Sequence, residues 1–361
     1  STMDLSGSMV LVQQLVILLC ISCFTSFSDA FISRSSSVFG SIGIQASAVP
    51  SANVLNASPL ATEELSIAER CYDAWNRRKM DDAAACFADD FTYDDGQYLG
   101  SINKRSEMER SFQRWAKALP PGAIVVVDHV AKCPTSGNIG TQWHVEKDDG
   151  SDVPFTRGCD FYTVEKKSGL IKTGFKVSEM IVKPSKQFSD ALVSSASNLM
   201  QSTGRLSSAG NQKLELVEST IESGSIIESY FGAWNRRDME SALDCFVDDC
   251  IYETEDPVFV GAFHGKEALR EHLVRNVEVL PSACKIILDD LAIDTDSGTS
   301  GVKWHLEANG VSIPNLRGCS MYTMDEATGL LKSAFDVTES PVKLPGVALD
   351  VLAAPFGKLL F

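Results

Sequence analysis

The chain has 361 residues, of which 44% are hydrophobic and 22% charged, and its formal net charge is −16 at pH 7. The hydrophobic content is that of a globular protein with a buried core, and the length suits two domains rather than one. The acidic balance argues against nucleic acid as a partner, because phosphate binding needs a basic surface, and equally against an anionic membrane surface.

Residues 1–30 predict a secretory signal peptide. Residues 10–24 form an apolar run that is too short and too close to the start for a membrane span. Small residues follow up to Ala30, where cleavage is expected, although no basic residue precedes the run.

Residues 31–62 have the composition of a transit peptide, with eight serines, one arginine and no acidic residue. A signal peptide followed by such a segment resembles the bipartite leaders of plastid proteins in algae with secondary plastids. In those leaders an Ala–Phe step like Ala30-Phe31 marks the junction. The resemblance implies the chloroplast stroma of such an alga as the location. Secretion with a serine-rich spacer is the alternative.

Helices open the next part of the chain. Residues 63–79 carry apolar side chains at helical spacing, residues 80–87 continue as a second short helix, and residues 91–93 suggest a strand. A third helix is expected over residues 106–119, where a pair of prolines stops it.

Four strands are expected after the helices. Apolar side chains recur there with a period of two, and turn residues separate the segments 123–133, 139–146, 155–165 and 170–182. This order predicts an α+β fold in which three N-terminal helices pack on a curved antiparallel sheet.

The chain then repeats itself. Residues 74–90 (AWNRRKMDDAAACFADD) and 233–249 (AWNRRDMESALDCFVDD) are identical at 11 of 17 positions, and later motifs recur with a similar offset. A period of this length is that of a whole small domain rather than of a solenoid unit. The sequence therefore predicts two tandem domains, at residues 63–184 and 221–344.

Two further segments accompany the domains. Residues 185–220 are expected to form a helix and a polar linker, and residues 345–361 an apolar helix. Each helix is placed to lie across a domain or its neighbour. A weak membrane contact is the alternative for the C-terminal segment, which is shorter than a full span.

Motifs in both copies resemble the nuclear transport factor 2-like superfamily, which includes SnoaL-like polyketide cyclases, ketosteroid isomerase and scytalone dehydratase. The plant and algal plastid members carry Trp-His-x-Glu, Pro-Phe-x-Arg-Gly-Cys-x-x-Tyr and a late Glu with Lys-Pro behind it. Those motifs are found here at residues 143–146, 154–162 and 179–184. The second copy departs at Asn315-Leu316 and at Leu344. The resemblance implies two cone-shaped domains that bind small apolar molecules, catalyse reactions without cofactors, or serve as interaction modules.

Two pairs of residues are weak candidates for catalysis. Asp128 and Asp289 fall on strands whose neighbouring inward positions are apolar, so each could be a base with a raised pKa. Both are followed by another polar residue, so the strand could simply leave the core there. Tyr93 and Tyr252 each lie three residues after an aspartate and could donate to a carbonyl oxygen, but packed tyrosines are the more common alternative.

A third group is the most distinctive. His144 and Glu146 share a face of their strand, and the alternation places Trp143 on the other, core-facing side. The group comprises His144, Glu146 and Arg157, repeated as His305, Glu307 and Arg317. We expect these residues to meet across a pseudo-twofold interface between the outer faces of the two sheets; a solvated face is the alternative. The His-to-Arg spacing differs by one residue between copies, so one hairpin must carry a bulge or a longer loop.

The sequence holds no glycine-rich phosphate loop, no Ser-His-Asp set and no metal-ligand spacing, so neither metal nor cofactor is expected. The predicted function is that of a plastid tandem-domain protein, in which a pair of cones binds a small apolar molecule or acts as a scaffold. The alternative is a cofactor-free isomerase, cyclase or dehydratase acting on a hydrophobic substrate.

Overall fold

A computed structural model describes part of the chain, and all of that part belongs to one compact unit beginning at Leu65. The described residues are 65–179, 225–256, 260–340 and 343. Four predicted segments lie outside them, namely the signal peptide (1–30), the transit-like segment (31–62), the helix and linker (185–220) and the C-terminal helix (345–361) with its proposed membrane contact. Within the described ranges, no helix is long and apolar enough to span a membrane.

The first repeat contains the three predicted helices, with strand β1 (Phe87–Asp95) between the second and the third. The helices are α2 (Ile67–Asn76), α3 (Met80–Ala85) and α4 (Arg105–Ala118). The start of α2 is fixed by a capping box, in which Ser66 accepts from the backbone of Glu69 and the Glu69 carboxylate accepts from the backbone of Ser66.

Five strands form the sheet of the first repeat. They are β1 (Phe87–Asp95), β2 (Ile124–Lys132), β3 (Asn138–Glu146), β4 (Gly158–Val164) and β5 (Ile171–Ser178), in the order β1-β5-β4-β3-β2. Neighbours from β2 to β5 are antiparallel, but β1 runs parallel to β5. The expected all-antiparallel sheet is thus mixed at this edge. Most of the domain separates β1 from β5 in sequence, so no hairpin imposes opposite directions on this pair.

The second repeat has the same plan with one additional strand, β7, beside β6. Its helices are α6 (Ile226–Asn235), α7 (Met239–Asp244) and α8 (Gly265–Val279). Its strands are β6 (Phe246–Thr254), β7 (Gly261–His264), β8 (Cys284–Asp294), β9 (Thr299–Ala308), β10 (Val311–Met324) and β11 (Leu331–Thr338), in the order β7-β6-β11-β10-β9-β8. The predicted difference between the hairpins is present. A tight turn at Asn309-Gly310 joins β9 to β10, and the pairing of these two strands shifts register further along. A longer loop joins β3 to β4.

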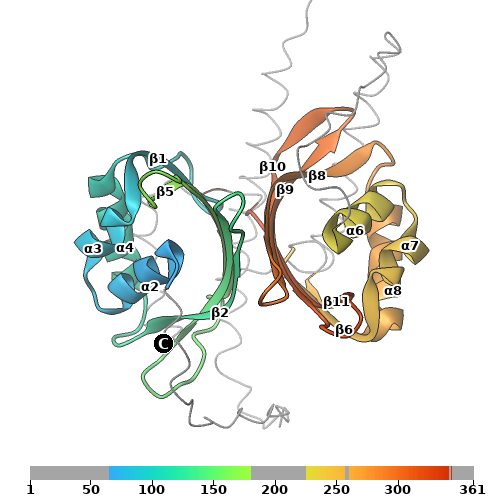
Figure 1. The fold of residues 1–361 in the computed structure, drawn as a ribbon, viewed down its shortest axis with the longest axis horizontal. Coiled ribbons are helices and arrows are strands. Elements are labelled where there is room, and N and C mark those ends of the chain that lie inside the picture. Colours follow the sequence, from blue (N-terminus) through green and yellow to red (C-terminus); the bar gives the residue numbers. More distant parts are fainter. Residues whose placement is uncertain (1–64, 180–224, 257–259, 341–342, 344–361) are drawn as a thin grey trace, which may run out of the picture. The chain divides into compact units, whose positions relative to one another are not determined.

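In each repeat the helices cover the concave face of the curved sheet (Figure 1). We call the space between the helices and this face the cone. Aromatic side chains fill the first cone, among them Trp75 of α2, Phe87 of β1 and Trp143 of β3, which are all at most 2% exposed. Trp143 and Val145 therefore lie on the core face, as the alternation in the sequence predicts.

The outer faces of the two sheets also bury side chains against each other. One apolar cluster draws equally on both sheets and comprises Ala131, Cys159, Phe161, Phe175, Val177, Ala292, Cys319, Met321, Phe335 and Val337. At its centre β3 and β9 approach so closely that a Cβ atom placed on Gly140 would lie 2.6 Å from the Cα atom of Gly301. Only glycine permits this backbone contact.

Polar contacts at this boundary come in matched pairs. The Asn138 side chain donates to the carbonyl oxygen of Leu291 at 3.2 Å, and the Thr299 hydroxyl donates to that of Val130 at 2.7 Å. Asn138 and Thr299 each begin the equivalent strand of their repeat. Equivalent residues therefore exchange equivalent contacts, which is the pattern of a twofold, self-complementary interface.

Candidate functional site

A buried carboxyl group lies at the centre of the first cone. Asp160 of β4 is only 2% exposed, and two tyrosine hydroxyls donate to its Oδ2 atom. Tyr162, two residues along the same strand, donates at 2.7 Å, and Tyr72 of α2 makes a shorter contact. The Tyr72 hydroxyl also lies 3.0 Å from the Thr141 hydroxyl. Two donors, one from α2 and one from β4, thus hold one oxygen of the carboxyl group, and Thr141 of β3 contacts the first of them.

The other oxygen of Asp160 is free for a ligand. Among the described residues its Oδ1 atom has no hydrogen-bond partner of normal geometry, and neither has the indole nitrogen of Trp143, although Trp143 acts to lower the pKa of Asp160. Burial raises the pKa of Asp160, although the nearby ammonium group of Lys176 opposes that shift. Burial, with Asp160 nearby, also raises the pKa values of Tyr72 and Tyr162, so both remain donors.

Lys176 of β5 lies beside Asp160, since the two residues are register partners on adjacent strands. Its side chain is 12% exposed, and its Nζ atom lies 3.9 Å from the ring centroid of Trp115 and 5.0 Å from that of Trp143. Asp95 of β1 approaches the same Nζ atom at 4.0 Å. Burial raises the pKa of Asp95 as well.

These groups surround a cavity of about 60 Å³. Its walls are mainly aromatic and include Tyr72, Trp75, Tyr93, Trp115, Trp143 and Tyr162. The volume admits several water molecules but is below the few hundred Å³ of typical ligand sites. Phe112 and Trp115 of α4 are only half-buried, so this helix forms the more exposed wall of the cavity.

The second cone carries different groups at the same two register positions. Ser320 of β10 replaces Asp160, and Asp336 of β11 replaces Lys176. The Ser320 hydroxyl donates to Asp336 and accepts from the Trp304 indole at 2.8 Å, while the Tyr252 hydroxyl lies 3.3 Å from Asp336. Asp336 keeps some accessible surface, yet protein atoms crowd its carboxyl group, and burial raises its pKa to about 6.

A neutral histidine lies in the wall of the second cone. His272 of α8 is 5% exposed and stacks on Phe263 with ring centroids 4.1 Å apart. Its Nε2 atom lies 3.1 Å from the side-chain amide of Asn276. Burial lowers the pKa of His272 to about 4, and Arg275 adds to that shift.

Neither Asp128 nor Asp289, the other two weak candidates for catalysis, lies inside a cone. Each side chain lies on the outer face, where Asp128 contacts His144 at 2.8 Å and Asp289 contacts His305 at 2.7 Å. The residue before each aspartate pairs with the core-facing tryptophan of the next strand, Val127 with Trp143 and Leu288 with Trp304. Alternation therefore turns each aspartate outward, and the break in register comes after it.

The two candidate tyrosines do lie inside the cones. Tyr93 lines the first cavity and is 6% exposed, and Tyr252 contacts Asp336 in the second cone. The expected pairing with the preceding aspartate is not formed in the first repeat, where Asp90 points outward to Lys172. Tyr93 therefore belongs to the aromatic wall around Asp160.

The arginines cross between the repeats, but the histidines do not. Arg157 contacts Glu179 of its own repeat at 2.9 Å and Glu253 and Glu255 of the other repeat at 2.5 Å. Arg317 likewise joins Glu339 of its own repeat to Asp94 of the first, with both contacts at 3.0 Å. Arginine is long enough to reach acids on the facing sheet.

The expected meeting of His144 and Glu146 with His305 and Glu307 does not occur. His144 contacts Glu146 at 3.1 Å and His305 contacts Glu307 at 3.2 Å, each within its own sheet. Both ring nitrogens of each histidine contact carboxylates on its own strand and on the adjacent one, so neither nitrogen is available for a contact across the boundary. Whether these residues carry a function stays a prediction.

One group on the outer face has the composition of a metal site. Ligand atoms of His144, Glu146 and Asp152 lie within 4.8 Å of one another. However, the two ring nitrogens of His144 already face Asp128 and Glu146. Burial alone would lower the pKa of His144, but these carboxylates raise it overall. Because carboxylates already engage both ring nitrogens, the group is better explained as a network of hydrogen bonds and ion pairs.

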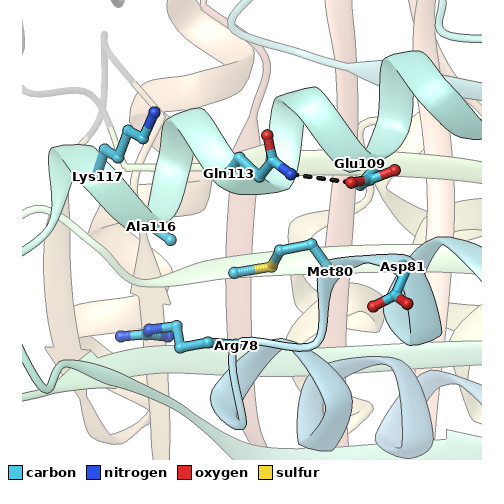
Figure 2. Close-up of a pocket in the computed structure, with 7 residues that line it drawn as sticks. All are labelled: Arg78, Met80, Asp81, Glu109, Gln113, Ala116 and Lys117. Carbon is cyan, nitrogen blue, oxygen red and sulfur yellow. Dashed lines mark hydrogen bonds between the residues drawn. The ribbon is translucent and has the colours of Figure 1, made fainter.

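A wider surface groove of about 430 Å³ lies between α3 and α4 of the first repeat (Figure 2). Met80 and Ala116 form its apolar part, while Asp81 and Glu109 place two acids at one end. In the second repeat Arg270 of α8 forms an ion pair with Glu240 of α7 across the corresponding gap. The groove holds no convergent buried groups, so we locate the chemistry in the cone.

The sequence interpretation missed Asp160, Lys176 and Asp336. A usable signal was present, because Asp160 lies two residues before Tyr162 and so shares its inward face. It was hidden because both faces of β4 are buried, one in the cone and one against the other sheet. A strand that is buried on both sides does not show a simple alternation.

Comparison with solved structures gives matches that each span about the length of one repeat. A protein of unknown function with a cystatin-like fold from Methylobium petroleophilum PM1 is 25% identical, covers 32% of this chain and 74% of its own, and has a TM-score of 0.28. A second cystatin-like protein, from Nostoc punctiforme PCC 73102, is 14% identical, covers 33% and 88%, and has a TM-score of 0.28. The epoxide hydrolase/cyclase-like enzyme SalBIII, involved in pyran ring formation in salinomycin, is 22% identical, covers 31% and 87%, and has a TM-score of 0.25.

No curated protein matches the chain. A family profile described as the SnoaL-like domain matches residues 68–173 and, separately, residues 227–332. Together these segments span more than half of the chain, and one falls in each repeat.

Proposed function

Because the chain belongs to the SnoaL-like domain family, with one domain in each repeat, we propose that its first cone binds a small, largely apolar molecule. The observation that carries this proposal is the carboxyl group of Asp160, which is buried among aromatic rings and has one oxygen without a partner. A buried polar atom of this kind costs free energy unless a ligand or water pairs with it. Convergent polar groups in an aromatic cavity are the usual signature of a ligand site.

The arrangement also defines how the ligand would be held. The tyrosines Tyr72 and Tyr162 donate to Oδ2 of Asp160, which leaves Oδ1 as the atom that faces a ligand. With a raised pKa, Asp160 can carry its proton on Oδ1 and donate it to a carbonyl or hydroxyl oxygen. The aromatic wall then supplies the apolar contact.

Proton transfer is a second candidate function, and the same carboxyl group favours it. In its ionised form this carboxyl group can remove a proton from carbon next to a carbonyl, and the resulting carboxylic acid can return that proton elsewhere. This step would make the first repeat a cofactor-free isomerase, cyclase or dehydratase. It needs no residue beyond those already around the cavity.

The test uses small neutral aromatic probes, namely 1-indanone, acetophenone and 2-phenylethanol. Three tryptophans line the cavity, so binding should quench their fluorescence. We expect saturable binding at millimolar concentration, weakened about tenfold in Asp160→Ala by the loss of one hydrogen bond to a buried group. Asp160→Asn should keep binding, because its amide still donates. Ser320→Ala in the second cone is the control.

The same experiment separates binding from catalysis. If Asp160 transfers protons, the protein should accelerate deuterium exchange at the α-carbon of 1-indanone in D₂O, and Asp160→Asn should abolish that exchange while it retains binding. The absence of binding of every probe would overturn the ligand proposal and favour a scaffold. Binding that Asp160→Ala leaves unchanged would place the site elsewhere.

We also propose a plastid location, which rests only on the composition of residues 1–62. A fluorescent protein fused to this segment should enter the plastid of an alga with secondary plastids. Phe31→Ala should redirect it, because Phe31 stands at the junction of the two leader parts. Secretion of the unaltered fusion would support the alternative location.

A further inference from the structure

Lys176 in the first cone has more donor capacity than the protein satisfies. An ammonium group offers three N–H donors. Among the described residues no hydrogen bond to Nζ of Lys176 is formed, and its one acidic contact, with Asp95, is at the 4.0 Å limit of an ion pair. The flanking rings of Trp115 and Trp143 attract the positive charge but accept no ordinary hydrogen bond.

The surroundings make this shortage costly. The Lys176 side chain is 12% exposed and lines the cavity, so bulk water reaches it poorly. A charged group that is enclosed without partners loses much of its favourable hydration free energy. An occupant of the cavity that offers an acceptor oxygen would recover part of this loss.

A second donor is available beside Lys176. Asp160 occupies the paired position on the adjacent strand, and its Oδ1 atom has no partner among the described residues. An ammonium N–H and a neutral carboxyl O–H placed side by side match the two oxygens of a single carboxylate group. Charge-assisted hydrogen bonds of this kind are roughly twice as strong as neutral ones.

We propose that the ligand of the first cone is an aromatic or similarly apolar carboxylic acid, whose carboxylate is held between Lys176 and Asp160 with its apolar part against the tryptophans. This inference deepens the proposed function and rests on it. It specifies the chemical class of the ligand, and it makes Lys176 the residue that determines specificity for that class.

The charges in the cone are consistent with an anionic ligand. Burial raises the pKa values of both Asp95 and Asp160. Protonation of Asp160 would leave Lys176 and Asp95 as an opposed pair, and the incoming carboxylate would favour that protonated state. The second cone places Asp336 at the position of Lys176 and would repel the same ligand.

The experiment compares three probes of nearly equal size, namely phenylacetate, phenylacetamide and 2-phenylethanol, by tryptophan fluorescence titration. We expect phenylacetate to bind about tenfold or more tightly than phenylacetamide, as charge-assisted hydrogen bonds predict. Lys176→Met should remove this preference, and Lys176→Arg should retain part of it. The matched control is Lys172→Met, on the same strand, because Lys172 pairs with exposed Asp90.

The outcomes distinguish this inference from the proposal on which it depends. Equal binding of all three probes would overturn the carboxylate clamp and leave the ligand site intact. Binding of none would overturn both. A preference for phenylacetate that survives in Lys176→Met, or disappears in Lys172→Met, would place the anion site elsewhere. Circular dichroism of each variant confirms that the fold is retained, and Lys176→Arg tests the charge if Lys176→Met does not fold.

Discussion

The two repeats share the plan of their outer faces but differ inside their cones. At one pair of register positions the first repeat has Asp160 and Lys176, whereas the second has Ser320 and Asp336. Each cone therefore encloses a carboxyl group, but only the first sets a cation beside it. The carboxyl group also comes from different strands, β4 in one repeat and β11 in the other.

Contacts between the two outer faces explain why both repeats have retained the same residues there. Arg157 and Arg317 each cross to acids of the other repeat, and each guanidinium also lies over a phenylalanine ring of the facing sheet. A change in one copy must suit the other copy at such a boundary. The cones contact no equivalent surface, so their interiors can diverge independently and take on different ligands.

The largest expected effect comes from a substitution that disrupts the contact between the two sheets. Gly140→Val would put a branched side chain where a single Cβ atom already lies 2.6 Å from the Gly301 Cα atom. Backbone cannot move aside as a side chain can, so we expect a loss of about 3 kcal/mol or more in the free energy of unfolding. Chemical denaturation followed by circular dichroism measures it.

Gly232→Ala is the matched control for Gly140→Val. Gly232 lies in α6, and an added Cβ atom there meets only the flexible tip of Arg236 at 3.3 Å. Alanine has the higher helix propensity, so stability should be unchanged or rise by up to about 1 kcal/mol. Equal stability of Gly140→Val and the unaltered protein would show that the two sheets do not rest on each other in solution.

The second effect concerns Asp336, whose pKa burial raises to about 6. An unfolded aspartate ionises near pH 4, so between about pH 4 and 6 the folded chain holds a proton that the unfolded chain releases. The contribution of Asp336 to stability therefore falls as pH rises through that window. Asp336→Asn should raise the free energy of unfolding by about 2 kcal/mol at pH 7.5 and by little at pH 4.

His272 acts in the opposite direction, which sharpens the test. Burial lowers the pKa of His272 to about 4, so between about pH 6.5 and pH 4 this histidine is protonated in the unfolded chain but not in the folded one. Its contribution to stability therefore falls as the pH falls through that range. The two dependences partly cancel in the unaltered protein. In Asp336→Asn stability should rise clearly from pH 4 to 6.5. Exposed Asp248→Asn is the control, and a flat profile in Asp336→Asn would contradict the assignment.

Much of this architecture could be predicted from periodicity and repetition alone. Three helices and four strands per repeat follow from the spacing of apolar residues, and the core face of β3 follows from Trp143 and Val145. A strand at residues 91–93 could be predicted, but the parallel pairing of β1 with β5 could not, because register between distant segments leaves no local pattern. The boundaries of the predicted domains stay predictions.

The candidate site was harder to predict for two physical reasons. Asp128 was assigned to the wrong face because apolar Ile124 and Val126 share its face and also point outward, so apolar character does not mark the core side of this strand. Asp160 was overlooked because β4 is buried on both faces, so an inward acid stands among apolar neighbours on every side. Both errors arise on strands that carry apolar residues on both faces, where the alternation of apolar and polar residues does not identify the face that points into the cone.

The smallest expected effect concerns the groove between α3 and α4 (Figure 2). Asp81 and Glu109 put like charges on facing helices in the first repeat, whereas Glu240 and Arg270 form an ion pair at the equivalent place in the second. Glu109→Arg should therefore create the missing pair and add about 0.5 kcal/mol to the free energy of unfolding at low salt. Because exposed pairs are screened, the gain should vanish at high salt. Glu109→Gln removes only the repulsion and should give a smaller gain, so a Glu109→Arg gain that persists in high salt would have to come from packing instead.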